Sequence, residues 1–390
     1  SSLLAFLLEH GPYLLDSTGN LTYNDFSWNQ YANVLYLESP TGVGFSYSTD
    51  GSNRFTDDNS TAILNMKALE EFMTRVHPQY ATRDFYLTGE SYAGVYIPYL
   101  SRAILNHTRI GQFSNTNFKG ITMGNAAVDN FSGSIAAAVQ LYSLGMIPEK
   151  HGALIFDLWN LVTKEEKDVL DDDKWDVFYE IFSNSSGKLS EDARYDVPLE
   201  CNLEEDETKW HITKSSTSVE CRVENLTETY LNRDDVQIAL HVRTEDRSEV
   251  HWKLTSLPVF YLYHKTEDTI PVYREIIDSA QPGFRILFFT GDMDLVCPPL
   301  QVAFGARRIA KQNGMSDVTT TAEWRYLGDF GGARTTYQAK NSGVIMDVIT
   351  VRGAGHLVPT SQPDRAFQII NNFISTEVEM VEYSRTIPRQ

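Results

Sequence analysis

The sequence predicts an α/β protein with a mostly parallel central sheet flanked by helices and a mainly helical insertion in the middle of the chain. Short apolar, β-rich runs recur, and each ends in a turn. Helical patterns separate several of these runs, and the strand signals fade between about residues 145 and 256. Runs that are apolar on both faces and alternate with helices are typical of a parallel sheet that is covered on both sides.

Each expected element follows from a local pattern. Apolar β-rich runs predict strands at 33–37, 85–88, 120–123, 285–290 and 344–351. The spacing of apolar residues predicts helices over 59–76, after Ser91, over 299–312 and over 363–374. The opening residues fit a short buried helix that ends at Gly11 and Pro12 better than they fit a signal peptide.

The insertion divides the predicted core into two halves. We expect the first half of the core at 1–144, a cap insertion at 145–256 and the second half of the core at 257–390. Helix-like stretches and a dense acidic segment at 164–176 replace the strand pattern inside the cap. We interpret the acidic segment as a solvated helix face.

Composition and charge exclude several classes of protein. The chain has 390 residues, of which 42% are hydrophobic, so it can fill a large core and is neither disordered throughout nor a simple coiled coil. Asp and Glu number 52 against 33 Lys and Arg, which gives a net charge of −19. Phosphate backbones and anionic membranes repel such a surface, so we expect neither nucleic acid nor a membrane as a partner. We also expect no metal and no cofactor.

The cysteines and the glycosylation sequons bear on the compartment. Cys201, Cys221 and Cys297 are too few for a disulfide scaffold and lack metal-ligand spacing, so one pair and one leftover thiol is the simplest arrangement. Sequons of the form N-x-S/T begin at Asn20, Asn59, Asn106, Asn130, Asn184 and Asn225. Together these features favour a secreted, lysosomal or vacuolar glycoprotein.

The sharpest local feature is a serine between an expected strand and an expected helix. Residues 86–94 read Tyr-Leu-Thr-Gly-Glu-Ser-Tyr-Ala-Gly, with Ser91 at the turn. In a nucleophile elbow the serine occupies a strained strand-to-helix turn, and its neighbours are small because strand and helix pass close together. Gly89 fits the pattern G-x-S-x-G, and Ala93 stands in place of the second glycine. Alone, this match equally permits an ordinary strand–turn–helix connection.

Two further strand ends strengthen the case for catalysis. Asp292 and Asp294 follow the expected strand at 285–290, and His356 follows the one at 344–351. A serine, then a carboxylate, then a histidine is the chain order of the catalytic triad in α/β hydrolases. A serine hydroxyl is a poor nucleophile until an imidazole removes its proton, and a buried carboxylate orients that imidazole.

Four blocks of the sequence resemble the serine carboxypeptidase family, to which cathepsin A belongs. They are Gly-Glu-Ser-Tyr-Ala-Gly at 89–94, Gly-Asp-Met-Asp at 291–294, Gly-Ala-Gly-His-Leu-Val-Pro at 353–359 and the segment 33–47. The resemblance covers the core halves well and the insertion only loosely. It implies an α/β-hydrolase fold and a serine carboxypeptidase that releases C-terminal residues from peptides at acidic pH.

The resemblance assigns roles to the residues of the three strand ends. It implies that Ser91 is the nucleophile, His356 the general base and acid, and Asp294 the orienting carboxylate. Asp292 is the rival for the last role and would otherwise serve the turn. The backbone amide of Tyr92, which follows the nucleophile, would donate to the oxyanion.

The resemblance also implies a subsite for the C-terminal carboxylate of the substrate. It places Glu9 and Glu90 in that subsite. Two adjacent carboxyls cannot both ionise cheaply, so one should keep its proton and donate it to the substrate carboxylate. Such a subsite would make peptidase activity strongest in acid.

The family pattern also bears on the cysteines and on the start of the chain. It implies that Cys201 pairs with Cys221 and that Cys297 is a free thiol near the site, although Cys297 also suits a buried packing position. In relatives a Gly-Gly-Pro-Gly-Cys stretch precedes Ser-Ser, and this sequence begins at that Ser-Ser. We therefore expect an N-terminal truncation that removes the second oxyanion donor and the first core strands, which leaves the activity of this chain open.

Two other functions stay open alongside the peptidase. An acyltransferase or esterase could use the same triad, because a nucleophile other than water can attack the acyl-enzyme. A non-catalytic protein that stabilises a partner is the second alternative. We expect peptides with a free C-terminal carboxylate as substrates, and we keep a homodimer as an option.

Overall fold

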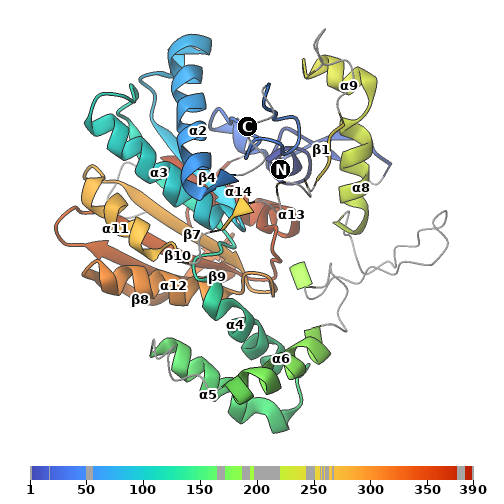
Figure 1. Ribbon diagram of the computed structural model, residues 1–390, viewed down its shortest axis with the longest axis vertical. Helices are drawn as coiled ribbons and strands as arrows, with labels where there is room; N and C mark the ends of the chain where they lie inside the picture. The colour runs from blue at the N-terminus through green and yellow to red at the C-terminus, as the bar shows by residue number, and fades with distance from the viewer. Residues whose placement is uncertain are drawn as a thin grey trace.

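The structure is a computed structural model that describes most of the chain. The described residues are 2–16, 18–49, 56–164, 172–186, 194–196, 220–242, 251–254, 256, 259, 263–265, 268–375 and 383–388. The centre of the molecule is a six-stranded sheet with the strand order β4-β5-β7-β10-β9-β8. Helices lie on both faces of this sheet, as Figure 1 shows.

The central sheet is mainly parallel, as the sequence predicted. Its strands are β4 (Phe85–Glu90), β5 (Phe118–Gly124), β7 (Arg285–Gly291), β10 (Ile345–Val351), β9 (Asp329–Ala339) and β8 (Met315–Tyr326). The first four run parallel to one another, and β9 and β8 continue the sheet in antiparallel pairing. The register pairs Glu90 with Gly124 and Gly291 with Val351. The segments that follow these strands therefore meet at one edge of the sheet, which is where α/β proteins bind ligands.

Alternate residues of β7 enter two separate apolar cores. Ile286 and Phe288 pack in one core, and Leu287 and Phe289 pack in the other. The helices of the first core are α2 (Asp58–Glu71), α3 (Ala93–Arg109), α11 (Ile270–Ser279) and α12 (Pro299–Gln312), and the second core contains α14 (Pro363–Ser375). Successive side chains of a strand point to opposite faces, so a strand covered on both faces has to be apolar throughout.

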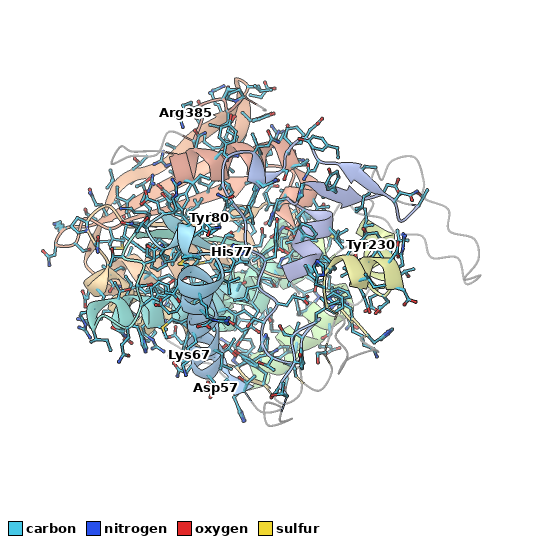
Figure 2. The ribbon with its side chains drawn as sticks, turned by 90° about the horizontal axis from the view of Figure 1, so that it is seen from above. Asp57, Lys67, His77, Tyr80, Tyr230 and Arg385 are labelled. Carbon is cyan, nitrogen blue, oxygen red and sulfur yellow. The ribbon has the colours of Figure 1, made fainter. Side chains whose placement is uncertain are left out.

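The described helices between 130 and 242 form two groups that pack in different places. The first group is α4 (Asn130–Ser143), α5 (Gly152–Thr163) and α6 (Asp172–Ser186), which share one apolar core. The second group is α8 (Glu220–Leu231) and α9 (Asp234–Ala239). Helix α8, which carries Tyr230, lies beside the N-terminal helix α1 (Ser2–Leu8) in both views (Figure 1, Figure 2). The boundaries of the insertion at 145 and 256 stay predictions.

Short elements complete the described fold. They are the hairpin β1 (Tyr13–Leu15) and β2 (Leu21–Tyr23), the paired strands β3 (Thr56–Asp57) and β6 (Tyr263–His264), and the helix α13 (Val358–Ser361). There are also the short 3₁₀ helices η1 (Trp28–Gln30), η3 (Pro78–Tyr80) and η4 (Glu149–His151) and the π-helical segment η2 (Phe72–Val76). None of the helices in the described part of the chain is long and apolar enough to cross a membrane.

The structure corrects one expected strand. The segment 33–37 was expected to be a strand, but it lies in an extended stretch without strand pairing. An apolar β-rich run becomes a strand only where a neighbouring strand accepts and donates its backbone hydrogen bonds. Within the described residues, this segment has no such neighbour.

The antiparallel hairpin of β8 and β9 was not predicted. Its turn consists of Leu327 and Gly328, which both have positive φ angles, 48° and 91°. Tyr326 and Asp329 pair directly across this two-residue turn. Paired positive φ angles are typical of the turns that join tight hairpins, but a leucine at the first position is an unusual signal.

Candidate active site

The backbone at Ser91 has the geometry of a nucleophile elbow. Ser91 lies between β4 and α3 with a φ of 59°, in the left-handed region that side chains other than glycine rarely adopt. Its amide donates to the carbonyl of Gly124 at 3.0 Å, and its carbonyl accepts from the amide of Ala127 at 2.9 Å. These bonds tie the serine turn to the end of β5.

Close packing explains the small residues around this turn. A Cβ atom added at Gly89 would lie 2.4 Å from the Cβ of Ala93, and one added at Gly94 would lie 2.8 Å from the amide nitrogen of Ala127. Glycine is therefore required at both positions. The methyl group of Ala93 fits at this turn because Gly89, which lies opposite it, has no side chain.

His356 and Asp294 form a buried hydrogen-bonded pair. The Nδ1 atom of His356 lies 2.7 Å from Oδ2 of Asp294, and the two side chains are 2% and 0% exposed. The same carboxylate accepts hydrogen bonds from the amides of Val296 at 2.7 Å and Cys297 at 3.0 Å. Because donors surround the carboxylate, it accepts from Nδ1–H of the histidine, which leaves Nε2 with a free lone pair.

Asp292, the rival carboxylate, has a different environment. Its Oδ1 atom accepts from the amide of Gly353 at 2.6 Å, which joins the loop after β7 to the loop after β10. Its carbonyl accepts from the side-chain amide of Gln140 at 2.9 Å. Burial raises the pKa of this carboxyl above its usual range. The structure thus brings Asp294, and not Asp292, against His356.

Asn125 belongs to this site although no motif in the sequence marks it. It follows β5 with a φ of 37°, and its side chain donates to Oδ2 of Asp294 at 2.7 Å and to the hydroxyl of Thr290 at 3.1 Å. Its Oδ1 atom accepts from the amide of Gly291 at 3.0 Å. Its position in the sequence could have indicated this role. Asn125 directly follows a core strand, so its amide side chain lies at the same edge of the sheet as Ser91, Asp294 and His356.

Glu9 and Glu90 form a second carboxyl pair, in which Glu9 is buried and Glu90 is half-buried. Glu9 is 5% exposed and lies in the turn after α1, while Glu90 is the last residue of β4. The two side chains are hydrogen-bonded to each other. Burial raises the pKa of Glu9 to about 7, against smaller lowering contributions from the bond to Glu90 and from His356. Burial and the charge of Glu9 raise the pKa of Glu90 well above its usual range.

Backbone contacts hold the Glu9 turn in place. The side-chain amide of the buried Asn24 donates to the carbonyls of Gly11 at 2.9 Å and Glu9 at 3.3 Å. The ring of His10 stacks on Trp28 with the centroids 3.8 Å apart, and burial lowers the pKa of His10 to about 3. His10 is therefore neutral and serves packing rather than proton transfer.

One cavity connects these groups. Its lining includes Ser91, Tyr92, His356, Glu9 and Glu90. Tyr92 directly precedes the first residue of α3, where the positive end of the helix dipole lies. Ser91 and His356 both line this cavity, so the hydroxyl and the imidazole face the same space.

The remaining sites named from the sequence divide into described and undescribed residues. Cys297 is a buried free thiol, and burial raises its pKa well above the usual range. Cys201 and the side chain of Cys221 lie outside the described residues, so their pairing stays a prediction. Among the sequons, Asn20, Asn59 and Asn184 are exposed, Asn106 is half-buried, and the side chains of Asn130 and Asn225 lie outside the described residues.

Comparisons with known proteins identify the family. The family model described as serine carboxypeptidase matches residues 1–376. The chain is 32% identical to serine carboxypeptidase ctsa-4.1 of Caenorhabditis elegans over 97% of this chain and 82% of that protein. It is also 32% identical to the putative serine carboxypeptidase-like 23 of Arabidopsis thaliana, over 94% and 78%. The structure resembles Kex1Δp, a prohormone-processing carboxypeptidase from Saccharomyces cerevisiae, with a TM-score of 0.72 and 22% identity over 96% and 80% of the two chains.

Both the predicted fold and the predicted class of enzyme are confirmed by these comparisons. The likeness to the yeast carboxypeptidase, together with the mainly parallel sheet, establishes the α/β-hydrolase fold. The homologues are named serine carboxypeptidases, which are hydrolases of the exopeptidase type. The chain therefore belongs to the serine carboxypeptidase family.

Proposed function

We propose that this chain releases C-terminal residues from peptides through an acyl-enzyme on Ser91, with His356 and Asp294 as the other members of the catalytic triad. Family membership supplies the reaction class and the peptide substrate. One observation carries the assignment of residues. The serine turn, the His356–Asp294 pair and the Glu9–Glu90 pair converge on one cavity at the carboxyl edge of the sheet.

In the proposed acylation step, Nε2 of His356 removes the proton of the Ser91 hydroxyl. The Ser91 oxygen attacks the carbonyl carbon of the last peptide bond, and the carbonyl oxygen becomes an oxyanion. The backbone amide of Tyr92, at the N-terminus of α3, would donate to this oxyanion. His356 then gives its proton to the leaving amine, and the acyl–Ser91 ester remains.

In the proposed deacylation step, water takes the place of the leaving amine. His356 removes a proton from the water, which attacks the ester, and the Ser91 hydroxyl regains a proton as the shortened peptide leaves. Asp294 keeps the imidazole in the required tautomer because its oxygen accepts from Nδ1–H at 2.7 Å. Asn125 and the amides of Val296 and Cys297 hold that carboxylate in position.

We propose the Glu9–Glu90 pair as the subsite for the C-terminal carboxylate. In acid the pair is protonated and can donate hydrogen bonds to the substrate carboxylate. As the pH rises through about 7, Glu9 loses its proton and the negative charge repels the substrate. An esterase or acyltransferase has no need of such a pair, and neither has a protein that only stabilises a partner, so the pair favours the peptidase.

The test compares peptides that differ only at the C-terminus. We expect the purified chain to hydrolyse a free-acid peptide at pH 5 and to leave its C-terminal amide largely intact. A serine-reactive phosphonate should label Ser91, and the Ser91→Ala variant provides the control. Equal turnover of acid and amide would refute exopeptidase recognition, and absence of labelling in the folded chain would refute catalysis by Ser91.

We also propose that the protein is lysosomal or vacuolar, or is secreted, and acts at acidic pH. The raised pKa of Glu9 and the exposed sequons at Asn20, Asn59 and Asn184 support this proposal. Expression in a secretory host followed by glycosidase treatment tests it. A chain that carries no glycan after passage through the secretory pathway would count against it.

A further inference from the structure

A short segment from the region between β5 and β7 lies across the two loops that carry Asp294 and His356. It consists of Arg194, Tyr195 and Asp196, and we call it the strap. The carbonyl of Arg194 accepts from the amide of Leu295 at 2.9 Å, next to Asp294. The carbonyl of Tyr195 accepts from the amide of His356 itself at 2.6 Å. The strap thus contacts both loops through consecutive carbonyl groups.

The strap packs tightly against the histidine loop. A Cβ atom added at Gly355 would lie 2.6 Å from the Cβ of Asp196 and 2.7 Å from the carbonyl oxygen of Tyr195. Only glycine therefore permits this approach. The Ser361 hydroxyl accepts from the amide of Gly355 at 3.1 Å and lies 3.4 Å from Oδ2 of Asp196, so it bridges the loop to the strap.

The side chain of Tyr195 contacts the catalytic imidazole directly. Its ring centroid lies 5.1 Å from that of His356, with an angle of 83° between the ring planes. Tyr195 and His356 both line the cavity of the proposed active site. The bond from Nδ1 to Asp294 holds one side of the imidazole, and the edge-to-face contact with Tyr195 lies against the ring as a second contact.

We propose that the strap is a positioning element, in which Tyr195 holds the His356 imidazole in the orientation that Ser91 requires. The inference rests on the proposed function, because it assumes that His356 is the general base. It makes the catalytic loops of the core depend on a segment that lies outside the central sheet. A displacement of about 1 Å at a catalytic group can cost about 100-fold in rate, so a contact of this kind affects the rate measurably.

The kinetic test uses Tyr195→Ala with Tyr195→Phe as the matched variant, because phenylalanine keeps the ring contact. We expect Tyr195→Ala to lower kcat and the rate of phosphonate labelling by about 10- to 100-fold, with little change in KM. Tyr195→Phe should retain the rates of the unmodified chain. The exposed Tyr179 of α6 provides the control for a general effect of the insertion, and Tyr179→Ala should change nothing.

A wedge variant tests the strap without changing its residues. Gly355→Ala should push the strap away from the loop and lower kcat as Tyr195→Ala does, with unchanged KM. Unchanged rates in both variants would overturn the proposal. A rise in kcat would also overturn it, because the strap would then obstruct the site rather than position its histidine.

A spectroscopic readout separates this proposal from the proposed function. The Nδ1–H proton of His356, bonded to Asp294, should give a downfield NMR signal in the unmodified chain and in Tyr195→Phe. In Tyr195→Ala this signal should broaden through exchange with water. A sharp signal in Tyr195→Ala would refute the positioning role even if the chain proves inactive, whereas inactivity with the expected NMR pattern would refute the proposed function alone.

Discussion

Two carboxyl sites in the same molecule show opposite chemistry. At the carboxyl ends of β7 and β10, Asp294 is 0% exposed and accepts hydrogen bonds from backbone amides, from Asn125 and from His356. In the turn after α1, Glu9 is 5% exposed, and its side chain bonds to another carboxyl. The first site surrounds its carboxyl with hydrogen-bond donors, whereas burial at the second raises the pKa of Glu9 and favours its protonated form. Burial alone does not decide the charge of an acid, because the number of donors around it does.

The largest expected effect tests the first of these sites, in which hydrogen-bond donors surround Asp294. Asp294→Asn should lower kcat by about 10³- to 10⁴-fold, because an amide can reverse the histidine tautomer while the fold is kept. Asp292→Asn is the matched variant in the same turn and should cost far less, since Asp292 contacts Gly353 and not the imidazole. Steady-state kinetics on one free-acid peptide measure both. Similar losses in the two variants would contradict the assignment.

The next effect tests the second site, the pair of Glu9 and Glu90. Glu9→Ala should lower kcat/KM for a free-acid peptide by about 10- to 100-fold, which corresponds to one hydrogen bond to a charged group. The same variant should hydrolyse a C-terminal ester or amide at nearly the original rate, so its preference for the free acid disappears. If acid and amide substrates lose activity equally, Glu9 has a structural role and not a binding role.

A smaller effect tests the connection between Asn125 and Asp294. Asn125→Gly removes the amide while it tolerates the positive φ of 37°, and it should lower kcat by about 10-fold. Thr290→Val, which removes the other partner of the amide nitrogen, serves as the control and should have little effect. A variant at 125 with full activity would show that the backbone amides suffice to hold Asp294.

The smallest effect is the dependence of stability on pH. The pKa of Glu9 is raised from 4.5 to about 7, so the folded chain binds this proton more tightly than the unfolded chain does. The resulting stability is fully present below about pH 4.5 and is lost as the pH rises through about 7. The melting temperature should therefore fall by a few degrees between pH 5 and pH 8.

The control for this pH dependence is a double variant in which Glu9 and Glu90 are both replaced. In Glu9→Gln combined with Glu90→Gln, neither side chain titrates, so the fall in melting temperature should be shallower than in the unmodified chain. The comparison isolates the pair, because Asp196 and Asp292 also have raised pKa values and contribute in the same direction in both proteins. Identical slopes would show that titration of the pair does not contribute to stability between pH 5 and pH 8, contrary to the prediction.

The sequence predicted the parts of the fold that depend on local pattern. Apolar runs identified β4, β5, β7 and β10, of which β5, β7 and β10 are buried on both faces and β4 is a half-buried edge strand. The helical spacing over 299–312 matches α12. The prediction of a strand at 33–37 was wrong, because a strand needs a pairing partner and the local sequence does not say whether one is present. The hairpin of β8 and β9 was missed because its turn uses a leucine with positive φ.

The predicted site shows the same division. Residues that follow core strands, such as Ser91, Asp294 and His356, are named by their place in the chain order. Asn125 shares that place, but only the three-dimensional structure shows its bond to Asp294. The strap residue Tyr195 lies far from any motif, and its contact with His356 joins a segment between β5 and β7 to the loop after β10. Long-range packing of this kind leaves no periodic trace in the sequence.

The left-handed backbone at Ser91 sets function against stability at one position. A serine there holds a conformation that costs about 1–3 kcal/mol for residues other than glycine. Ser91→Ala and Ser91→Gly should therefore both be inactive, yet the glycine variant should melt at a higher temperature than the alanine variant. Selection for thermal resistance without selection for activity would drive this position away from serine, because the residue that performs the chemistry is poorly suited to the conformation it adopts.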